Sequence, residues 1–427
     1  MSITLSKNLE MIAPSATVAM TQLARDLKSE GKDVISLSAG EPDFDTPDNI
    51  KKAAIDAINR GETKYTAVDG IDELKEAIIK KFNRDNNLNF LKENISVAPG
   101  GKTIIYNALI ATLNPGDEVI IPKPYWVSYP DIVKLAGGKP VTISTTVENN
   151  FKITDSDLEK NITEKTKWII LNSPSNPTGE VYNLNELLSL VKVLKKYPNI
   201  YILSDDIYEY LLYKESDQFS TIGQIDEEIN SRTLTMNGVS KAYSMTGWRI
   251  GYCGGPKKII DAMRKLQGQS TSNPSSISQW AAVEALNGDQ EFLKNWLKSF
   301  EERRNKVYEL INSAEGLSCL LPKGAFYIYP SCSNLIGKKL PNGDLINNDE
   351  DFAMSLLKSK SVGIVHGSAF GLSPYFRISY ATSMEKLEEA CNRILSLIHI
   401  SEPTRLLSIY EDRFSLKKKS GGGGGGG

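Results

Sequence analysis

The chain has 427 residues, of which 40% are hydrophobic and 24% charged, as in an ordinary soluble globular protein. Its 50 lysines and arginines are balanced by 52 acidic residues, which argues against a nucleic-acid partner or a membrane surface. No apolar run reaches the roughly 18–20 residues that cross a bilayer, and we expect no secretory signal. The length predicts two domains, or one large domain with a smaller partner.

Cysteine and histidine are scarce and scattered. The cysteines show neither pairing nor metal-like spacing, which is typical of reduced thiols and predicts a cytoplasmic location. The two histidines, His366 and His399, leave little room for a Ser-His-Asp triad, a Cys-His dyad or a histidine-rich metal site. If the chain is an enzyme, we expect another group to move protons and no metal to be bound. The cysteines are Cys253, Cys319, Cys332 and Cys391.

Helices and apolar runs alternate through the first half of the chain. The first predicted helix, 46–61, has Thr46 as its cap, Pro47 in its first turn and Gly61 at its exit. Apolar strands between helices predict an α/β fold with a mostly parallel sheet covered on both faces, and such sheets bind ligands at the carboxyl ends of their strands. Further helices are predicted at 71–82 and 102–113, and strands at 118–122, 167–172, 200–205 and 232–237.

A different pattern begins after a long helical region at about 290–313. Short strand-like runs separated by helices predict a smaller α+β domain, with which the N-terminal residues are expected to pack. The predicted division is an N-terminal segment 1–45, a large domain 46–300 and a small domain 301–395.

The last residues change character. From Ser396 no helical or strand period is sustained, and the chain ends in a lysine run and seven glycines, as in a disordered tail or linker. We prefer the hypothesis that 396–427 is not native, because SLIHISEPTR looks like a translated sequencing adapter. A genomic copy of the gene that encodes this tail would contradict the hypothesis.

The segment TMNGVSKAYSMTGWRIGY, residues 235–252, holds Lys241 among small and apolar residues, followed by Arg249. Most lysines after a strand are only solvated, but a lysine that forms a Schiff base must be partly desolvated, so that its amine is free near neutral pH. Arg249 is a fixed cation suited to a phosphate. The segment resembles the lysine signature of class I pyridoxal-phosphate-dependent aminotransferases. The resemblance to their aspartate aminotransferase group, which includes bacterial aspartate/prephenate aminotransferases, covers about residues 5–395.

The resemblance implies the fold type I of pyridoxal-phosphate-dependent transferases, with the cofactor on Lys241. SPSNPTG at 173–179 reads by itself as a proline turn, but the resemblance places Asn176 at the phenolic oxygen of the cofactor. An acid at a strand end is often a helix cap. The resemblance instead sets Asp205 against the ring nitrogen, which a buried carboxylate keeps protonated, and Tyr208 at the phenolic oxygen. The family spacing of acid and tyrosine selects Asp205 over Asp206.

Other positions are implied for the phosphate and the ring. Two glycines that open a helix let backbone N–H groups approach a phosphate, although the pattern is common. The resemblance implies that Gly101 and Lys102 contribute amides there, and that the Lys102 ammonium meets the distal carboxylate of acidic substrates. Trp126 would otherwise be a core aromatic, and is implied to stack on the ring. Many relatives carry serine where this chain has Gly238, so a phosphate bond is expected to shift to Ser240.

The resemblance places Gly40 at the substrate carboxylate and Arg377 at the substrate α-carboxylate. An arginine on a short apolar strand needs a partner, and its planar fork suits a carboxylate. Relatives send the tyrosine at position 65 across a dimer interface to the neighbour's phosphate, which implies a homodimer for this chain through Tyr65. The substrate-binding residues are expected to be Gly40, Lys102, Trp126, Asn176 and Arg377.

These residues predict transfer of an amino group from L-aspartate to 2-oxoglutarate, with Lys241, Asp205 and Tyr208 as the catalytic residues. Ala13 stands where relatives that accept prephenate often carry lysine, which weighs against that substrate, and His366 is interpreted as structural. Alternatives are an aminotransferase or lyase for neutral, aromatic or sulfur amino acids, or for prephenate. A cofactor-binding regulator and a catalytically dead binding protein remain as other classes.

Overall fold

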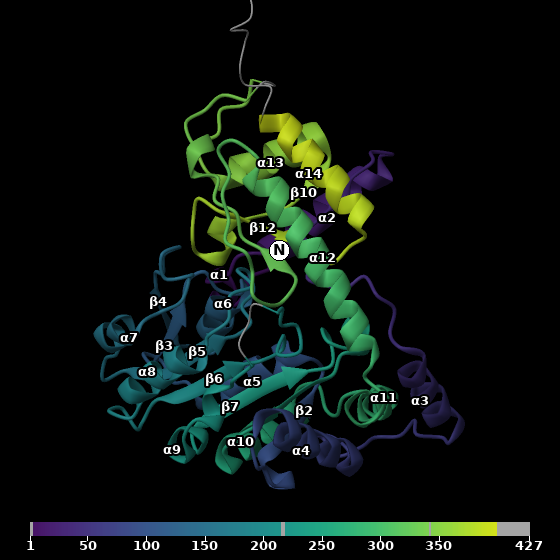
Figure 1. The fold of residues 1–427 in the computed structure, drawn as a ribbon. Helices are drawn as coiled ribbons and strands as arrows, with labels where there is room; N and C mark the ends of the chain where they lie inside the picture. Colours follow the sequence, from purple (N-terminus) through teal and green to yellow (C-terminus); the bar gives the residue numbers. More distant parts are fainter. Residues whose placement is uncertain (1–2, 215–217, 341–342, 399–427) are drawn as a thin grey trace, which may run out of the picture.

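A central sheet of seven strands organises the computed structural model, which describes residues 3–214, 218–340 and 343–398. The strands are β2 (Ile95–Ala98), β3 (Glu118–Pro122), β4 (Lys139–Ile143), β5 (Thr166–Asn172), β6 (Tyr201–Asp205), β7 (Thr233–Gly238) and β8 (Gly251–Gly254). Their order across the sheet is β2-β8-β7-β6-β5-β3-β4 (Figure 1). Only β8 runs against its neighbours, β7 and β2, so the sheet is mostly parallel and the predicted α/β fold is confirmed.

The four predicted strands are β3, β5, β6 and β7, each within a residue of its expected ends. Alternate side chains of these strands enter different cores. On β5, Trp168 and Ile170 pack in one cluster and Ile169 in another. Strands β3, β5 and β6 are therefore covered on both faces, which explains why their sequences are apolar without alternation. In β7, Leu234 and Met236 pack in one cluster and alternate with buried threonines.

The helices that cover the sheet lie in the lower part of Figure 1. The predicted helices 71–82 and 102–113 are present, and the first of them continues to Asn86. These helices are α3 (Asp48–Asn59), α4 (Asp72–Asn86), α5 (Gly101–Thr112), α6 (Ser128–Leu135), α7 (Asp155–Asn161), α8 (Leu184–Leu194), α9 (Glu227–Asn230), α10 (Lys257–Gly268) and α11 (Ser276–Asn287).

The prediction that Thr46 caps α3 is wrong. The helix begins at Asp48, and Pro47 precedes it without a side-chain cap. The Thr46 hydroxyl donates instead to the backbone carbonyl of Ser244 at 2.7 Å. A tertiary partner has therefore replaced the local one, and it ties the start of α3 to the loop that follows Lys241.

A close backbone contact sets the start of α5 on the sheet. A Cβ at Gly251 of β8 would lie 2.2 Å from the amide nitrogen of Gly101 and 2.4 Å from the carbonyl carbon of Gly100. Only glycine permits this approach. The first amides of α5 consequently lie at the sheet edge, beside the ends of the central strands.

The remaining elements form the upper part of Figure 1. The N-terminal strand β1 (Ile35–Ser36) pairs in parallel with β10 (Val362–Gly363). A three-stranded antiparallel sheet has the order β11-β12-β9, from β11 (Val365–His366), β12 (Phe376–Ser379) and β9 (Tyr327–Ile328). The helices here are α2 (Ala16–Ser29), α13 (Asp349–Lys360) and α14 (Met384–Ile398), while α1 (Lys7–Glu10) lies against α6 of the lower part.

Helix α12 (Phe292–Asn312) connects the two parts (Figure 1). Leu293 packs in the cluster that includes α3, α4 and α11. Val307 and Ile311 pack in the upper core with β9, β12 and α14. The helix crosses the expected boundary at 300–301 without a break, and so belongs to both cores.

Helix α14 extends three residues beyond the expected end of the native sequence. Ser396, Leu397 and Ile398 are helical, and the last two are buried in the upper core. The expected loss of helical period from Ser396 is therefore wrong at these three residues, because they complete an apolar helix face. The rest of the predicted tail, 399–427, lies outside the described residues.

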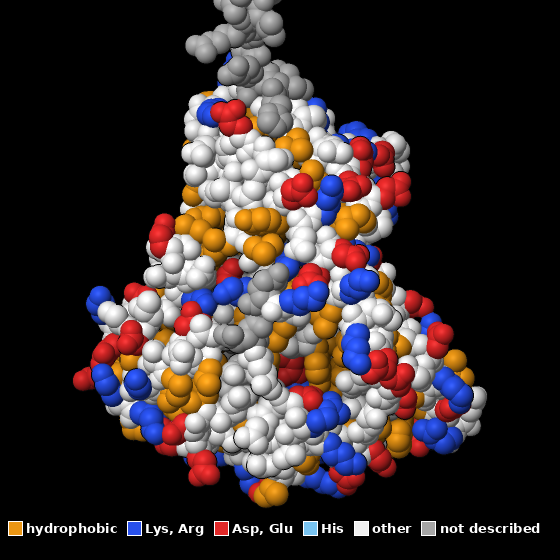
Figure 2. Space-filling model, in the orientation of Figure 1, with side chains coloured by type: hydrophobic (Ala, Val, Ile, Leu, Met, Phe, Trp, Pro, Cys, Tyr) orange, Lys and Arg blue, Asp and Glu red, His pale blue; other side chains and the backbone are white. Residues whose placement is uncertain are grey.

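The described helices include none long and apolar enough to pass through a bilayer. On the face shown in Figure 2, acidic and basic side chains are interspersed. This face therefore carries no single-sign field, in keeping with the balanced composition.

Candidate active site

A cavity of about 400 Å³ lies at the carboxyl ends of β5, β6 and β7. Sheet topology brings these ends together, since parallel strands release their last residues along one edge. Segments from the upper part and from the N-terminal region complete the walls. Eleven of the twelve predicted site residues line it: Gly40, Gly101, Lys102, Trp126, Asn176, Asp205, Tyr208, Ser240, Lys241, Arg249 and Arg377.

Tyr65 is the twelfth residue and does not line this cavity. Its side chain is 93% exposed, on the segment between α3 and α4. Within one chain the structure therefore does not bring Tyr65 to the other predicted site residues.

Lys241 projects into the cavity just beyond the end of β7. Its Nζ donates to the backbone carbonyl of Gly40 at 2.6 Å. Burial lowers the pKa of Lys241 to about 8, against about 10.4 for a free lysine. A substantial fraction of the amine is thus unprotonated at mildly alkaline pH, as covalent chemistry with a carbonyl requires.

Asp205 ends β6 and is buried on the wall of the same cavity. Its Oδ2 accepts from the Tyr129 hydroxyl at 2.5 Å, and burial raises its pKa to about 6. The carboxylate is still mainly ionised at neutral pH, and a cation placed against it would lower the pKa again. Asp206 does not line the cavity; its Oδ1 accepts from Ser204 Oγ at 2.6 Å.

Tyr208 and Asn176 lie on the cavity wall with their own partners. The Tyr208 and Tyr327 hydroxyls are 2.8 Å apart, and burial raises the pKa of Tyr208, which keeps it a hydrogen-bond donor. The Asn176 backbone amide donates to Asn172 Oδ1 at 2.8 Å, which fixes the turn that follows β5.

Arg377 is buried on β12 and enters the cavity from the upper part. Its Nη1 donates to Asn176 Oδ1 at 2.8 Å and its Nη2 to the Ser38 carbonyl at 2.5 Å. The guanidinium carbon lies 4.5 Å from the centre of the Tyr327 ring, while the buried Nε has no hydrogen-bond partner among the described residues. No carboxylate neutralises this charge in those contacts, so the group suits an anionic ligand.

An anion cradle forms where α5 begins. Gly100 has φ +90°, and a Cβ there would lie 2.2 Å from Arg249 Nη2. Glycine thereby lets the guanidinium lie against the first amides of α5, where the helix dipole is positive. Ser240 lines the same cavity, as expected for a phosphate contact shifted from Gly238.

Lys102 and Trp126 form another wall. The Lys102 Nζ lies 5.0 Å from the centre of the Trp126 ring. Burial, and then repulsion from Arg249, lowers the pKa of Lys102. An ammonium that is partly desolvated and near another cation would gain from a carboxylate partner.

Sequence reasoning missed several residues that line this cavity, among them Arg25 and three that orient predicted site residues. Tyr129, Tyr327 and Asn172 line the cavity and orient Asp205, Tyr208 and Asn176. Tyr129 lies three positions after Trp126 in the same aromatic segment, and this proximity could have indicated a place in the site. His366, interpreted as structural, bonds Ser368 Oγ through Nδ1 at 2.6 Å.

A partly desolvated lysine, a buried carboxylate and an anion cradle at the ends of a mostly parallel sheet define a pyridoxal-phosphate-dependent enzyme of fold type I. The profile of the family "Aminotransferase class I and II" matches residues 32–394. The chain belongs to this family.

Individual relatives match this chain over nearly its whole length. It is 60% identical over 390 residues to a probable aspartate/prephenate aminotransferase of Rhizobium leguminosarum, covering 91% of this chain and 97% of that protein. Its identity to an aspartate/prephenate aminotransferase of Cereibacter sphaeroides is 57%, with the same coverage. The crystal structure of an aspartate aminotransferase from Rhizobium meliloti matches with TM-score 0.90 at 50% identity, covering 93% of this chain and 99% of that one.

The residues present fit the cofactor of this family. The cradle of Arg249, Ser240 and the first amides of α5 would hold its phosphate. The Asp205 carboxylate, whose pKa burial has raised, would gain a cationic partner in the ring nitrogen. Lys241 would bond the aldehyde.

The lowered pKa of Lys241 leads to a test in protein freed of cofactor. The rate constant for its reaction with pyridoxal phosphate should rise about tenfold per pH unit below pH 8, because only the neutral amine is a nucleophile, and level off above about 8. Stopped-flow absorbance would measure it, with Lys241→Ala as the control for other lysines. A midpoint near 10 would contradict the proposed desolvation.

Proposed function

We propose that this enzyme transfers the amino group of L-aspartate to 2-oxoglutarate, with pyridoxal phosphate held on Lys241. The observation that carries the proposal is one cavity that joins Lys241 and Asp205 to two further cationic groups, Arg377 and Lys102. Arg377 and Lys102 provide a cationic partner for each carboxylate of a dicarboxylic amino acid, and Arg25 lines the cavity as well.

The names of relatives support this substrate class. Those in Rhizobium leguminosarum and Cereibacter sphaeroides carry aspartate in their names. The aspartate aminotransferase of Thermus thermophilus, 39% identical with TM-score 0.86, was solved with maleate, a dicarboxylate. In this chain Arg377 would bind the α-carboxylate and Lys102 the distal one, with Gly40 at the substrate carboxylate.

The proposed mechanism assigns proton transfer to Lys241. When bound, the cofactor supplies an aldehyde that exchanges amines and a ring that withdraws electrons from the substrate α-carbon. The free Lys241 amine would take the proton from the substrate α-carbon and return it to the cofactor carbon. Its low pKa suits both steps, because the group must accept and release a proton near neutral pH.

The surrounding residues orient and stabilise. The Tyr129 hydroxyl fixes the Asp205 carboxylate, which would hold the ring nitrogen in its protonated form. Tyr208 and Asn176 would donate to the phenolic oxygen, while Trp126 covers the ring and excludes water from one face.

Prephenate is the second candidate substrate. Both relatives at 60% and 57% identity are named for aspartate and prephenate together. The two names favour prephenate as a substrate, whereas Ala13 weighs against it. Steady-state kinetics with prephenate beside 2-oxoglutarate as amino acceptors would decide between them.

The first prediction for this function concerns Lys241. Lys241→Ala should lower kcat by at least about 10²–10⁴-fold, since the proton-transfer group is lost. Addition of aspartate to the wild-type protein should shift its visible absorption band. The same addition to the variant should leave its band in place. Far-UV circular dichroism of the variant would confirm that it is folded. Activity that survives in a folded variant would refute the assignment.

Lys102 should determine the preference for an acidic side chain. Lys102→Met should lower kcat/KM for aspartate by about 10- to 100-fold, the value of a charge-assisted contact. It should leave kcat/KM for alanine nearly unchanged, because alanine has no distal carboxylate. Lys80→Met, an exposed lysine of α4, is the control. Equal losses for both amino acids would contradict the specificity role.

We propose that the enzyme is a homodimer with Tyr65 reaching the partner's phosphate site. The exposed Tyr65 supports this, as do Ile55 and Ile58 on the neighbouring helix α3, which are 56% and 50% exposed. Exposed apolar side chains beside a functional residue are typical of an interface.

Subunit mixing tests this assembly. Tyr65→Ala and Lys241→Ala should each be weakly active alone. After equal amounts are mixed and subunits exchange, about half of the dimers should be hybrids, each with one wild-type site of two. The mixture should therefore show about one quarter of wild-type activity. Sedimentation velocity would report the oligomeric state. A monomer at assay concentration, or no gain on mixing, would contradict the proposal.

We also propose a cytoplasmic location. The four cysteines are free, and Cys253, Cys332 and Cys391 are buried, as in proteins kept in a reducing compartment. Recovery of the protein from an oxidising compartment by cell fractionation would contradict this location.

A further inference from the structure

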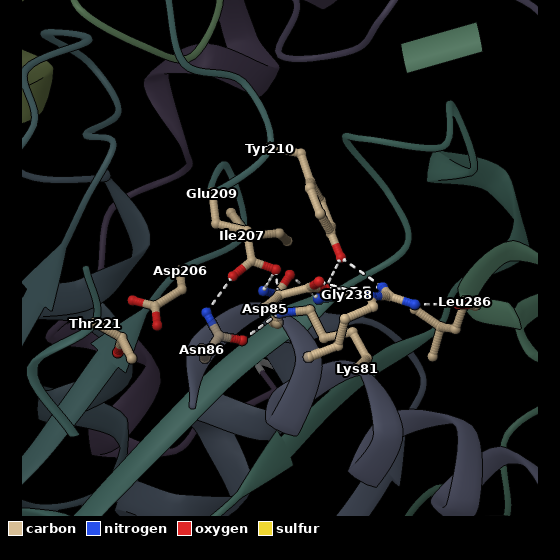
Figure 3. Close-up of polar contacts among 12 residues, drawn as sticks. Lys81, Asp85, Asn86, Asp206, Ile207, Glu209, Tyr210, Thr221, Gly238 and Leu286 are labelled. Atoms are coloured by element: carbon tan, nitrogen blue, oxygen red, sulfur yellow. Dashed lines mark hydrogen bonds and ion pairs between the residues drawn. The ribbon is translucent and has the colours of Figure 1, made fainter. Parts of the chain in front are cut away.

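A buried polar network lies behind the cavity, on the side of Tyr208 that faces α4. Its centre is the carboxylate of Glu209, the residue after Tyr208 (Figure 3). Glu209 Oε2 accepts from Asn86 Nδ2 at 2.7 Å and Oε1 from Asn237 Nδ2 at 2.8 Å. Oε1 also forms an ion pair with Lys81, whose Nζ donates to Asn86 Oδ1 at 2.6 Å. Glu209 does not line the cavity.

The four side chains of this network are buried, so their polar groups depend on one another for hydrogen bonds. Lys81 is 0% exposed, Asn86 1%, Asn237 2% and Glu209 4%. The cost of removing two charges from water cancels much or all of their attraction, so a buried ion pair adds little net stability. A fully bonded pair does fix geometry, because any displacement leaves a buried polar group without its partner. The network is therefore better explained by the positions that it holds than by stability.

The positions that it holds are those of the reactive groups. Asp205 and Tyr208 precede Glu209 on the segment that leaves β6, and Lys241 follows Asn237 on the segment that leaves β7. Asn237 Oδ1 also accepts from the Gly238 amide at 2.8 Å, which ties its side chain to the start of the Lys241 loop. The Glu209 carboxylate thus bridges two neighbouring segments at the point where they leave the sheet.

A second set of contacts braces the same segment from outside. The Tyr210 hydroxyl bonds to Asp85 of α4, and Arg84 Nη2 donates to Tyr210 Oη at 3.4 Å (Figure 3). Arg84 Nη1 in turn donates to the Leu286 carbonyl of α11 at 3.3 Å. Residues 208–210 are therefore anchored to α4 by two consecutive side chains.

We propose that Glu209, held by Lys81, Asn86 and Asn237, is a positioning residue that fixes Asp205 and Tyr208 relative to Lys241. This inference rests on the proposed function, since it assigns those three residues to one reaction. A misplacement of about 1 Å can cost two orders of magnitude in rate, so the network influences catalysis without touching the reactants.

The test removes both charges together. Lys81→Met with Glu209→Gln keeps side-chain volume and removes both charges of the pair, so neither is left buried without the other. The buried Asp206 carboxylate, which Lys81 also attracts, keeps its bond from Ser204, so the folded state should persist. In the holoenzyme we expect kcat for aspartate to fall on the order of tenfold or more, with KM little changed. We also expect the pH midpoint of the cofactor's visible band to rise, because a displaced Tyr208 stabilises the ionised phenolic oxygen less well.

A matched control lies on the same helix. Lys75 and Asp69 form a buried ion pair at 2.9 Å that does not line the cavity. Lys75→Met with Asp69→Asn also removes one buried pair, together with the 3.3 Å contact of Asp69 with the half-exposed Arg264, and should leave both kcat and the pH midpoint at wild-type values. The same changes in both double variants would mean that any buried pair matters equally, and would overturn the proposal.

The remaining outcomes are separable. If the Lys81/Glu209 variant folds and keeps wild-type kcat and pH midpoint, the network is only structural and the inference fails. If it does not fold, Asn237→Ala removes the bond to Glu209 and the bond from the Gly238 amide, and leaves the ion pair in place; wild-type behaviour of that variant also overturns the inference. If the wild-type protein fails to bind pyridoxal phosphate in an equilibrium titration, the proposed function fails instead.

Discussion

The burial of the Asp205 carboxylate is the constraint around which the site is arranged. A charge at the end of a central strand, out of contact with bulk water, is costly unless hydrogen bonds and a cation offset the lost hydration. Tyr129 supplies one short bond and Ile207 a longer backbone bond at 3.4 Å. The raised pKa of Asp205 shows that these contacts do not offset the cost in full. A cationic ring nitrogen would complete the compensation, which is why this acid suits the cofactor of the family.

The opposite charges follow from the same topology. Parallel strands release Asn172, Asp205 and the Lys241 loop along one edge, and the start of α5 brings its positive end to the same edge. Arg377 reaches the cavity from the upper part, so the substrate site is shared between both parts of the chain. The fold thereby places one anion and several cations around a small volume, without relying on residues that are close in sequence.

Much of the fold could be predicted because its signals were local, whereas the roles of most site residues came from their resemblance to a family. Apolar runs marked β3, β5, β6 and β7, and polar residues at their ends marked the cavity. What could not be predicted depended on distant partners. Tyr129 and Asp205 are 76 residues apart, and Tyr208 and Tyr327 are 119 apart. Thr46 had the sequence of a cap, yet its hydroxyl bonds a carbonyl 198 residues away. Local chemistry allows both outcomes, and only tertiary packing selects one.

The continuity of α12 has a consequence for how the molecule loses its structure. One uninterrupted helix gives Leu293 to the core beside the sheet and Val307 to the upper core. If one core unfolded while the other stayed folded, α12 would have to break between them. Heat should therefore melt the two cores as one cooperative unit rather than in separate steps, despite the size of the chain.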